Sequence, residues 1–180
     1  MSLDERTTRI DTGIVDVVVI APTPAARNGG HDAPHPASSA RRVRGLWRIL
    51  TMRRAAGVRC TGGWELVHGN IEPNERPADA ARREVLEETG LRVERLYSIT
   101  ANPFYLPVAD VVQVALVFAA VVEVDAPVTL GVEHDAFAWR TPRAALTHLL
   151  WPREHDAVRY AMHLLRTGDA GPAEDVLRIR

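Results

Sequence analysis

The segment from Pro77 to Gly90 is the part of the chain whose local structure is most constrained by its residues. Pro77 suits the first turn of a helix, because its missing N–H has no helical partner there and its φ is already helical. Residues 78–89 are almost all good helix formers. Gly90 suits the position after a helix, since glycine tolerates the left-handed conformation. The sequence therefore predicts a helix over residues 78–89.

Three glutamates share one face of this predicted helix. Glu84, Glu87 and Glu88 fall within an arc about 100° wide, next to an apolar arc that the fold can bury. Carboxylates in the last turn meet the negative end of the helix dipole, at a cost of roughly 0.3–1 kcal/mol each. A solvated acidic face is the ordinary explanation for such a cluster. Clustered carboxylate oxygens also suit Mg²⁺, with Mn²⁺ able to substitute, which would relieve their repulsion.

The glutamates belong to a longer pattern, GNIEPNERPADAARREVLEETGL, between Gly69 and Leu91. It reads G-x5-E-x7-R-E-U-x-E-E-x-G-U, where U is a bulky apolar residue. Its seven fixed polar and glycine positions would match by chance about once in 10⁸ windows. The pattern resembles the Nudix box, the signature of hydrolases that act on nucleoside diphosphates linked to another group.

The resemblance implies a fold, a reaction and roles for particular residues. The Nudix fold is α/β, with a mixed β-sheet sandwiched between helices (α/β/α). The reaction is Mg²⁺-dependent hydrolysis of a phosphorus-containing anhydride, in which a metal-activated water attacks phosphorus. The matching metal ligands are Glu84, Glu87, Glu88 and the carbonyl of Gly69. Arg83 and Glu75 match an ion pair that supports the site, and the planar fork of arginine suits bidentate pairing.

Strand and helix patterns elsewhere agree with one α/β domain over residues 1–180. Segments rich in β-branched residues predict strands at Ile14–Ala21, Leu46–Met52, Trp64–His68, Val93–Ser98 and Val111–Val124. Apolar residues at helical spacing predict helices at Pro142–Leu150 and Arg153–Arg166. Residues 22–43 are rich in Pro, Ala, Gly and Ser, which predicts a mobile insertion. Residues 168–180 are expected to form either a short capping segment or a flexible tail.

Several residues outside the box are candidates for substrate contacts. The Glu133–His134 pair and the tryptophans after it resemble the pattern that follows the box in certain bacterial Nudix proteins. Those proteins are similar to hydrolases of dihydroneopterin triphosphate and dATP. In that comparison Glu133 matches an acidic residue that approaches the metals, as a ligand or as general base, or else it is a surface glutamate. Phe104 or Tyr105 can stack on a heterocyclic base, but neighbours in a strand point to opposite faces, so we expect only one to do so.

His68 stands where many relatives carry a glycine, which could place a titrating group near the phosphates. Trp139 and Trp151 are expected in the core, and His134 is expected to be structural.

Composition limits the partners and the compartment. A formal net charge of −1 gives no electrostatic case for nucleic acid or an anionic membrane. The single cysteine, Cys60, excludes an internal disulfide and fits a reducing cytoplasm. No signal peptide or membrane-spanning run is evident. We therefore expect a cytoplasmic enzyme with a small nucleotide-like diphosphate substrate and no organic cofactor; homodimerisation is left open.

The favoured function is a pyrophosphohydrolase of a (deoxy)nucleoside or pterin triphosphate. The alternative is a hydrolase of ADP-ribose or another nucleoside-diphosphate derivative. A nucleotide-sensing domain without catalysis is a third possibility, and the intact glutamates disfavour it.

Overall fold

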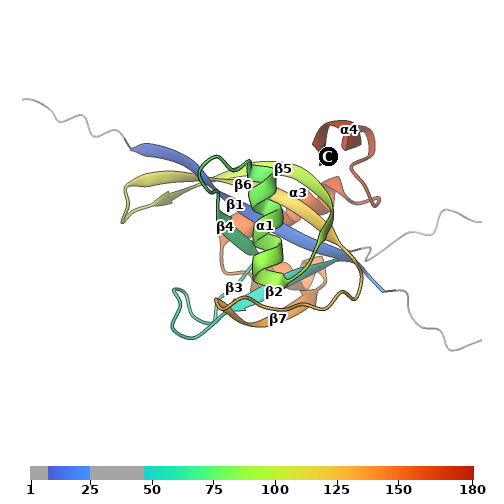
Figure 1. Ribbon diagram of the computed structural model, residues 1–180, viewed down its shortest axis with the longest axis horizontal. Helices are drawn as coiled ribbons and strands as arrows, with labels where there is room; N and C mark the ends of the chain where they lie inside the picture. Colours follow the sequence, from blue (N-terminus) through green and yellow to red (C-terminus); the bar gives the residue numbers. More distant parts are fainter. Residues whose placement is uncertain (1–7, 25–46) are drawn as a thin grey trace, which may run out of the picture.

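A mixed β-sheet forms the centre of the molecule (Figure 1). The computed structural model describes residues 8–24 and 47–180. Within them the strand order is β3-β2-β1-β6-β5-β8, with β4 pairing β1 and β7 pairing β2. Only β1 and β6 run parallel; the other described pairs are antiparallel. The strands are β1 (Arg9–Pro22), β2 (Trp47–Arg54), β3 (Trp64–Glu65), β4 (Val67–Asn70), β5 (Val93–Leu106), β6 (Val111–Val122), β7 (His134–Arg140) and β8 (Arg178–Ile179).

The predicted strands are present, although several of them begin or end at other residues than predicted. Two of the differences have clear physical causes. The strand expected at Trp64–His68 is divided into β3 and β4, because the N–H of Leu66 donates to the carboxyl of Glu154 (2.9 Å) instead of to a neighbouring strand. The strand expected to end at Ser98 continues to Leu106. The extension is not evident from the sequence because Pro103 argues against a strand. The proline is tolerated because, among the described strands, only β6 pairs with β5 at that point.

The helices are α1 (Pro77–Thr89), α2 (Pro142–His148), α3 (Pro152–Leu164) and α4 (Glu174–Leu177), with a 3₁₀ turn, η1, at Gly171–Ala173. The prediction for α1 is confirmed: Pro77 opens the helix, and Gly90 ends it in the left-handed conformation (φ 70°). The segment after Thr167 contains η1, α4 and β8, and β8 pairs with β5. Most of the predicted insertion, residues 25–43, and the predicted strand residue Leu46 lie outside the described residues.

Helices cover the two faces of the sheet, as predicted (Figure 1). On one face α1 buries Ala78, Ala81 and Val85 against alternate residues of β1. On the other face α2 and α3 pack against the intervening residues, such as Val18 and Ile20. Full burial of one such valine or isoleucine contributes roughly 1.5–3 kcal/mol. The α/β/α arrangement therefore follows from the nearly continuous apolar run of β1, whose successive residues supply apolar side chains to both faces of the sheet. Among the described helices none is long and apolar enough to cross a membrane.

Glu154 is a fully buried carboxyl group in the first turn of α3. One oxygen accepts from Leu66, and Oε2 has no partner among the described residues. Burial is the main cause that raises its pKa well above the usual range, and nearby Asp16 adds to the effect. The neutral acid is therefore favoured in the folded protein.

We expect Glu154→Gln to stabilise the protein at pH 8 but not at pH 4. A carboxyl with a raised folded-state pKa keeps its proton when the unfolded chain releases it, so stability falls as the pH rises above the unfolded pKa. The amide oxygen of glutamine can still accept from Leu66. Thermal unfolding at both pH values measures the difference, with Glu123→Gln, on the surface, as control. An equal pH dependence in wild type and Glu154→Gln would contradict the prediction.

Candidate active site

Arg83 ties the loop before α1 to the helix. Its Nε and Nη2 donate to the two carboxylate oxygens of Glu75, both at 2.9 Å, and Nη2 also donates to the carbonyl of Asn70 (2.8 Å). The ion pair expected between Arg83 and Glu75 is thus present and bidentate. Hydrogen bonding to Arg83 lowers the pKa of Glu75 to about 2. The loop after β4 is consequently held in one position relative to α1.

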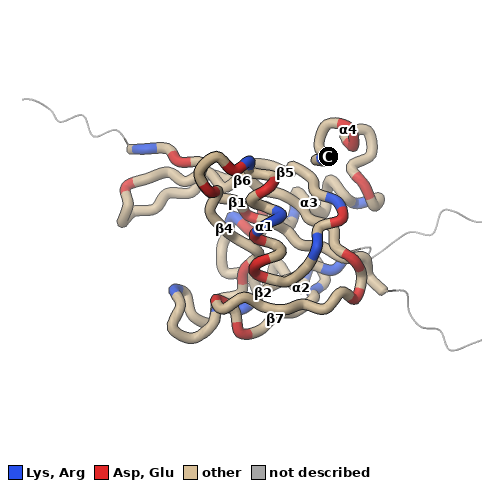
Figure 2. Tube along the Cα trace, viewed as in Figure 1, with Lys and Arg blue, Asp and Glu red and all other residues tan. Residues whose placement is uncertain are grey.

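Acidic and basic positions lie close together along α1 (Figure 2), and the same guanidinium also contacts the acidic face of this helix. Arg83 Nη1 donates to Glu84 Oε1 (2.8 Å) and to Glu87 Oε2 (3.1 Å). Burial raises the pKa of Glu84, while Arg83 opposes that shift. Arg83 therefore contacts Glu75, as predicted, and also two of the predicted metal ligands, Glu84 and Glu87. The last two contacts were not predicted.

Gly69 lies directly against the carboxylate of Glu84. A Cβ at position 69 would overlap Cδ and both oxygens of Glu84 far inside van der Waals contact. The backbone of β4 can approach the acidic face of α1 this closely only because residue 69 has no side chain. The structure thus brings together Gly69 and Glu84, as the sequence pattern implied.

Glu88 is the most perturbed carboxyl group of this cluster. Its Oε2 is buried and has no hydrogen-bond partner among the described residues. Burial, followed by the charges of Glu84, Glu65 and Glu133, raises the pKa of Glu88 to about 9. A buried carboxylate that three others repel requires a positive partner if it is to carry its charge.

Glu65 belongs to this group but was not predicted from the sequence. It is buried, and Oε1 accepts from Arg54 Nη1 (2.6 Å) and pairs with His134 Nε2 (3.1 Å). These two partners hold the pKa of Glu65 below its usual range against the opposing effect of burial. Arg54 Nη2 also donates to Glu133 Oε2 (3.1 Å). Arg54 thereby links Glu65 to Glu133, whose side chain is 61% exposed.

The donor set fits a divalent cation. No three His, Cys, Asp or Glu side chains within residues 8–24 and 47–180 already stand in a metal-ligand arrangement, since Glu84 and Glu87 face Arg83. Carboxylate oxygens are nevertheless the ligands that Mg²⁺ prefers. The unpartnered buried oxygen of Glu88 is the observation that favours a cation here.

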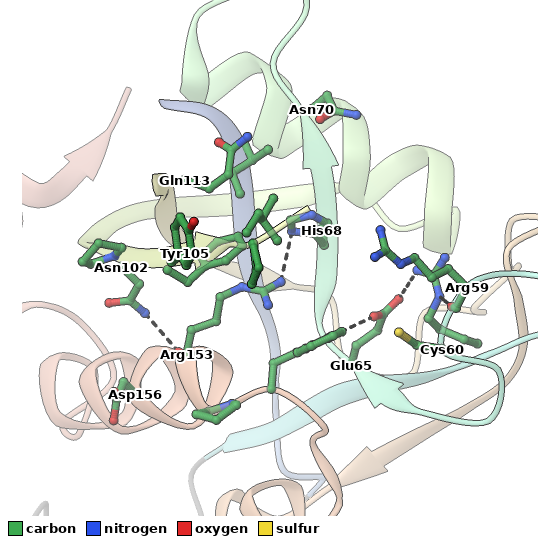
Figure 3. A pocket seen from close by; sticks show the side chains of 18 residues that line it. Arg59, Cys60, Glu65, His68, Asn70, Asn102, Tyr105, Gln113, Arg153 and Asp156 are labelled. Atoms are coloured by element: carbon green, nitrogen blue, oxygen red, sulfur yellow. Dashed lines mark hydrogen bonds and ion pairs between the residues drawn. The ribbon is translucent and has the colours of Figure 1, made fainter. Parts of the chain in front are cut away.

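A cavity of about 850 Å³ lies on the opposite side of β4. His68 and Asn70 line it, whereas the intervening Gly69 faces Glu84 on α1. Figure 3 shows His68 and Tyr105 at its wall. Its volume lies within the usual range for small-molecule sites. The cavity also adjoins the acidic cluster directly, because Glu65 and Arg54 line it as well.

Phe104 and Tyr105 both line the cavity, and so do all residues from 102 to 107. All six residues can line it because β5 borders the cavity along an edge that, among the described residues, is unpaired here. That only one of the two rings stacks on a heterocycle stays a prediction. Trp151 also lines the cavity, which corrects its assignment to the core. Trp139 does pack against the core, and His134 is buried against Glu65, as expected.

A buried ion-pair cluster joins the cavity wall to the sheet. Asp16 in β1 is fully buried and lies 2.6 Å from His68 Nδ1 and 2.9 Å from Arg153 Nε. These partners hold its pKa below the usual range despite the opposing effect of burial. Asp16 and Arg153 were not singled out from the sequence. The available signal was a lone carboxylate within the apolar run of β1.

Comparison with known proteins agrees with this architecture. The NUDIX domain family model matches residues 34–161. The chain is 39% identical over 116 residues to an octanoyltransferase of Myxococcus xanthus, covering 63% of this chain and 32% of that protein. It is 40% identical over 58 residues to an RNA pyrophosphohydrolase of Bartonella tribocorum, covering 32% and 33% of the two chains. The matches thus span about a third of each of these relatives.

The fold has counterparts among solved structures. The MutT protein from Methanosarcina mazei superposes with a TM-score of 0.61 at 22% identity, covering 90% of this chain and 98% of that one. This similarity concerns the fold alone. The family match, which covers most of the chain and includes the whole acidic helix, carries the assignment. The chain therefore belongs to the Nudix family of hydrolases.

Proposed function

We propose that this chain is a Mg²⁺-dependent pyrophosphohydrolase that cleaves a diphosphate linkage in a (deoxy)nucleoside or pterin triphosphate. The observation that carries the proposal is the unpartnered, buried oxygen of Glu88 among three other carboxylates, one of which, Glu65, lines a cavity of about 850 Å³. The acidic cluster suits the metal-bound phosphates, and the cavity suits a heterocycle.

Glu84, Glu87, Glu88 and the carbonyl of Gly69 would hold the ion, with Mn²⁺ able to replace Mg²⁺. When bound, a divalent ion neutralises phosphate charge and lowers the pKa of coordinated water. Arg83 keeps Glu84 and Glu87 at the same end of α1 through its Nη1 contacts. Its bidentate pair with Glu75 holds the preceding loop in place before substrate binds, while the carboxylates of Glu84 and Glu87 would turn from Arg83 toward the ion.

Glu133 is proposed to accept the proton of the attacking water. Arg54 holds its Oε2 at 3.1 Å, and the side chain is largely open to solvent. Through Arg54 it lies close to Glu65, a buried glutamate of the acidic cluster. A base must lie within hydrogen-bond reach of the water that it activates. Glu133 combines this proximity with exposure, whereas Glu65 is buried in its ion pairs.

The substrate's ring is proposed to occupy the cavity. Phe104 and Tyr105 provide aromatic surface, and His68, which directly precedes Gly69, also lines the cavity. Aromatic side chains favour stacked or edge-on contacts with planar rings. A triphosphate attached to such a ring would extend past His68 toward Glu88.

A substrate panel tests the proposed function directly. We expect the enzyme with Mg²⁺ or Mn²⁺ to hydrolyse deoxynucleoside triphosphates or dihydroneopterin triphosphate, and chelation by EDTA to abolish the reaction. The panel includes 8-oxo-dGTP, ADP-ribose, dinucleoside polyphosphates and, because of the named relatives, RNA with a 5′-triphosphate. Release of pyrophosphate and phosphate is measured separately. A preference for ADP-ribose would replace the proposed substrate class, and binding without any hydrolysis would identify a nucleotide sensor.

A further inference from the structure

Arg153 is held rigidly at the wall of the cavity (Figure 3). Its Nε donates to Asp16 Oδ2 (2.9 Å), and Nη2 lies 3.4 Å from Asp16 Oδ1. The guanidinium carbon lies 4.6 Å from the ring centre of Phe104 and 5.4 Å from that of Trp151. A buried carboxylate and two aromatic rings thus fix the plane of the guanidinium, which reduces the entropy lost on binding a ligand.

One edge of this guanidinium remains available. Nη1 of Arg153 donates to none of the residues that the structure describes, although the Asp16 contacts occupy Nε and Nη2. Arginine is a donor only and stays charged at any physiological pH. The group therefore complements a ligand edge that carries hydrogen-bond acceptors and disfavours one that carries an amino group.

A second polar group at the cavity lacks a partner. Oε1 of Gln113, on β6, is buried and accepts no hydrogen bond from the described residues. An amide oxygen of this kind complements an N–H or amino group of a ligand. The amide can also rotate by 180° to present its NH₂ group, so Gln113 adapts to either pattern. Discrimination between ligands then depends on Arg153, which cannot adapt.

We propose that Arg153 determines specificity, and that the cavity favours rings with an oxo group next to a ring N–H, as in guanine and pterin, over adenine. The oxo group would accept from Arg153, and the ring N–H or amino group would donate to Gln113. Adenine places an amino group where guanine has its oxygen, so its N–H groups would oppose the donors of Arg153. This inference rests on the proposed function because it names the heterocycle of that substrate.

The expected selectivity is measurable in turnover. We expect kcat/KM for dGTP and dITP to exceed that for dATP by about 10-fold, near the lower end of what a bidentate arginine–base pair gives, because Nε and Nη2 already contact Asp16. Arg153→Gln should bring the ratio close to one, because glutamine offers the donor and the acceptor that adenine requires. Arg153→Lys keeps a donor-only charge and should preserve the direction of the preference. Arg159→Gln, on the exposed side of α3, is the matched control and should keep the wild-type ratio.

Binding of dGMP and dAMP, measured by calorimetry, separates this inference from the proposed function. Preferential binding of dGMP by the wild type, lost in Arg153→Gln, supports the inference even if no triphosphate is hydrolysed. Hydrolysis of triphosphates with equal use of dGTP and dATP overturns it while leaving the proposed function intact. An unchanged dGMP preference in a folded Arg153→Gln variant overturns it as well. If that variant fails to fold, loss of the preference in Arg153→Lys overturns it.

Discussion

Glu88→Gln is expected to lower Mg²⁺-dependent turnover by about 10²–10³-fold while making the ion-free protein more stable. The two effects have one cause. The carboxyl of Glu88 is buried beside Glu84, Glu65 and Glu133, and its pKa is raised to about 9. Glutamine reproduces the neutral acid, which suits the ion-free site, but it supplies no negative charge to hold a divalent cation.

The sign of the pH dependence follows from the raised pKa. Between the ordinary value of 4.5 and about 9, the folded protein retains a proton on Glu88 that the unfolded chain releases. In EDTA the wild type should therefore lose stability as the pH rises through this interval. Glu88→Gln removes this contribution, so its melting temperature should vary less with pH.

Calorimetry and activity measurements together check this prediction. Adding Mg²⁺ should raise the Tm of the wild type at pH 8, because the ion binds the folded state only. The same addition should leave the Tm of Glu88→Gln nearly unchanged. Glu123→Gln, an exposed glutamate outside the site, should behave as the wild type in both respects. Near-normal turnover by a folded Glu88→Gln protein would show that Glu88 does not hold the metal.

Gly69→Ala is expected to lower both the stability and the activity of the protein through a steric clash with Glu84. The new methyl group would occupy the position of the Glu84 carboxylate, so either Glu84 or β4 must move. Overpacking of this kind costs typically 1–3 kcal/mol. Displacing Glu84 also breaks its 2.8 Å contact with Arg83 Nη1. We therefore expect turnover to fall by at least about 10²-fold, since small displacements in a site have effects of this size.

A compensating variant distinguishes the steric cause from a general loss of folding. Glu84→Asp shortens the side chain, so the double variant Gly69→Ala/Glu84→Asp should recover much of the lost stability. It should not recover activity, because the carboxylate of residue 84 no longer reaches the same point. Gly13→Ala is the matched control, since its new methyl group would meet only the carboxylate of Asp11, at 3.1 Å. A Gly69→Ala protein with wild-type Tm and turnover would contradict the close approach of β4 to Glu84.

The parts of the fold that sequence predicted correctly are those with a strong local signal. Pro77, Gly90 and the helix formers between them define α1 without help from the rest of the chain. The extension of β5 past Ser98 has no comparable signal, because Pro103 argues against a strand. Its register depends on pairing with β6, residues distant in the sequence. The break at Leu66 is likewise invisible locally, since it depends on Glu154 in a helix 88 positions away.

The same distinction between local signals and distant contacts applies to the candidate site. The sequence by itself determined the family pattern and the acidic face of α1, because fixed spacing and helical periodicity need no knowledge of distant contacts. The Arg83–Glu75 pair was expected from the resemblance to the Nudix box. Only the tertiary structure decided that Glu65 joins the acidic cluster, that Trp151 lines the cavity and that Asp16 holds Arg153. The physical reason is that burial and charge pairing depend on which strands and helices meet. A glutamate in a short strand and an aspartate in an apolar one acquire their roles only when the sheet brings distant partners to them.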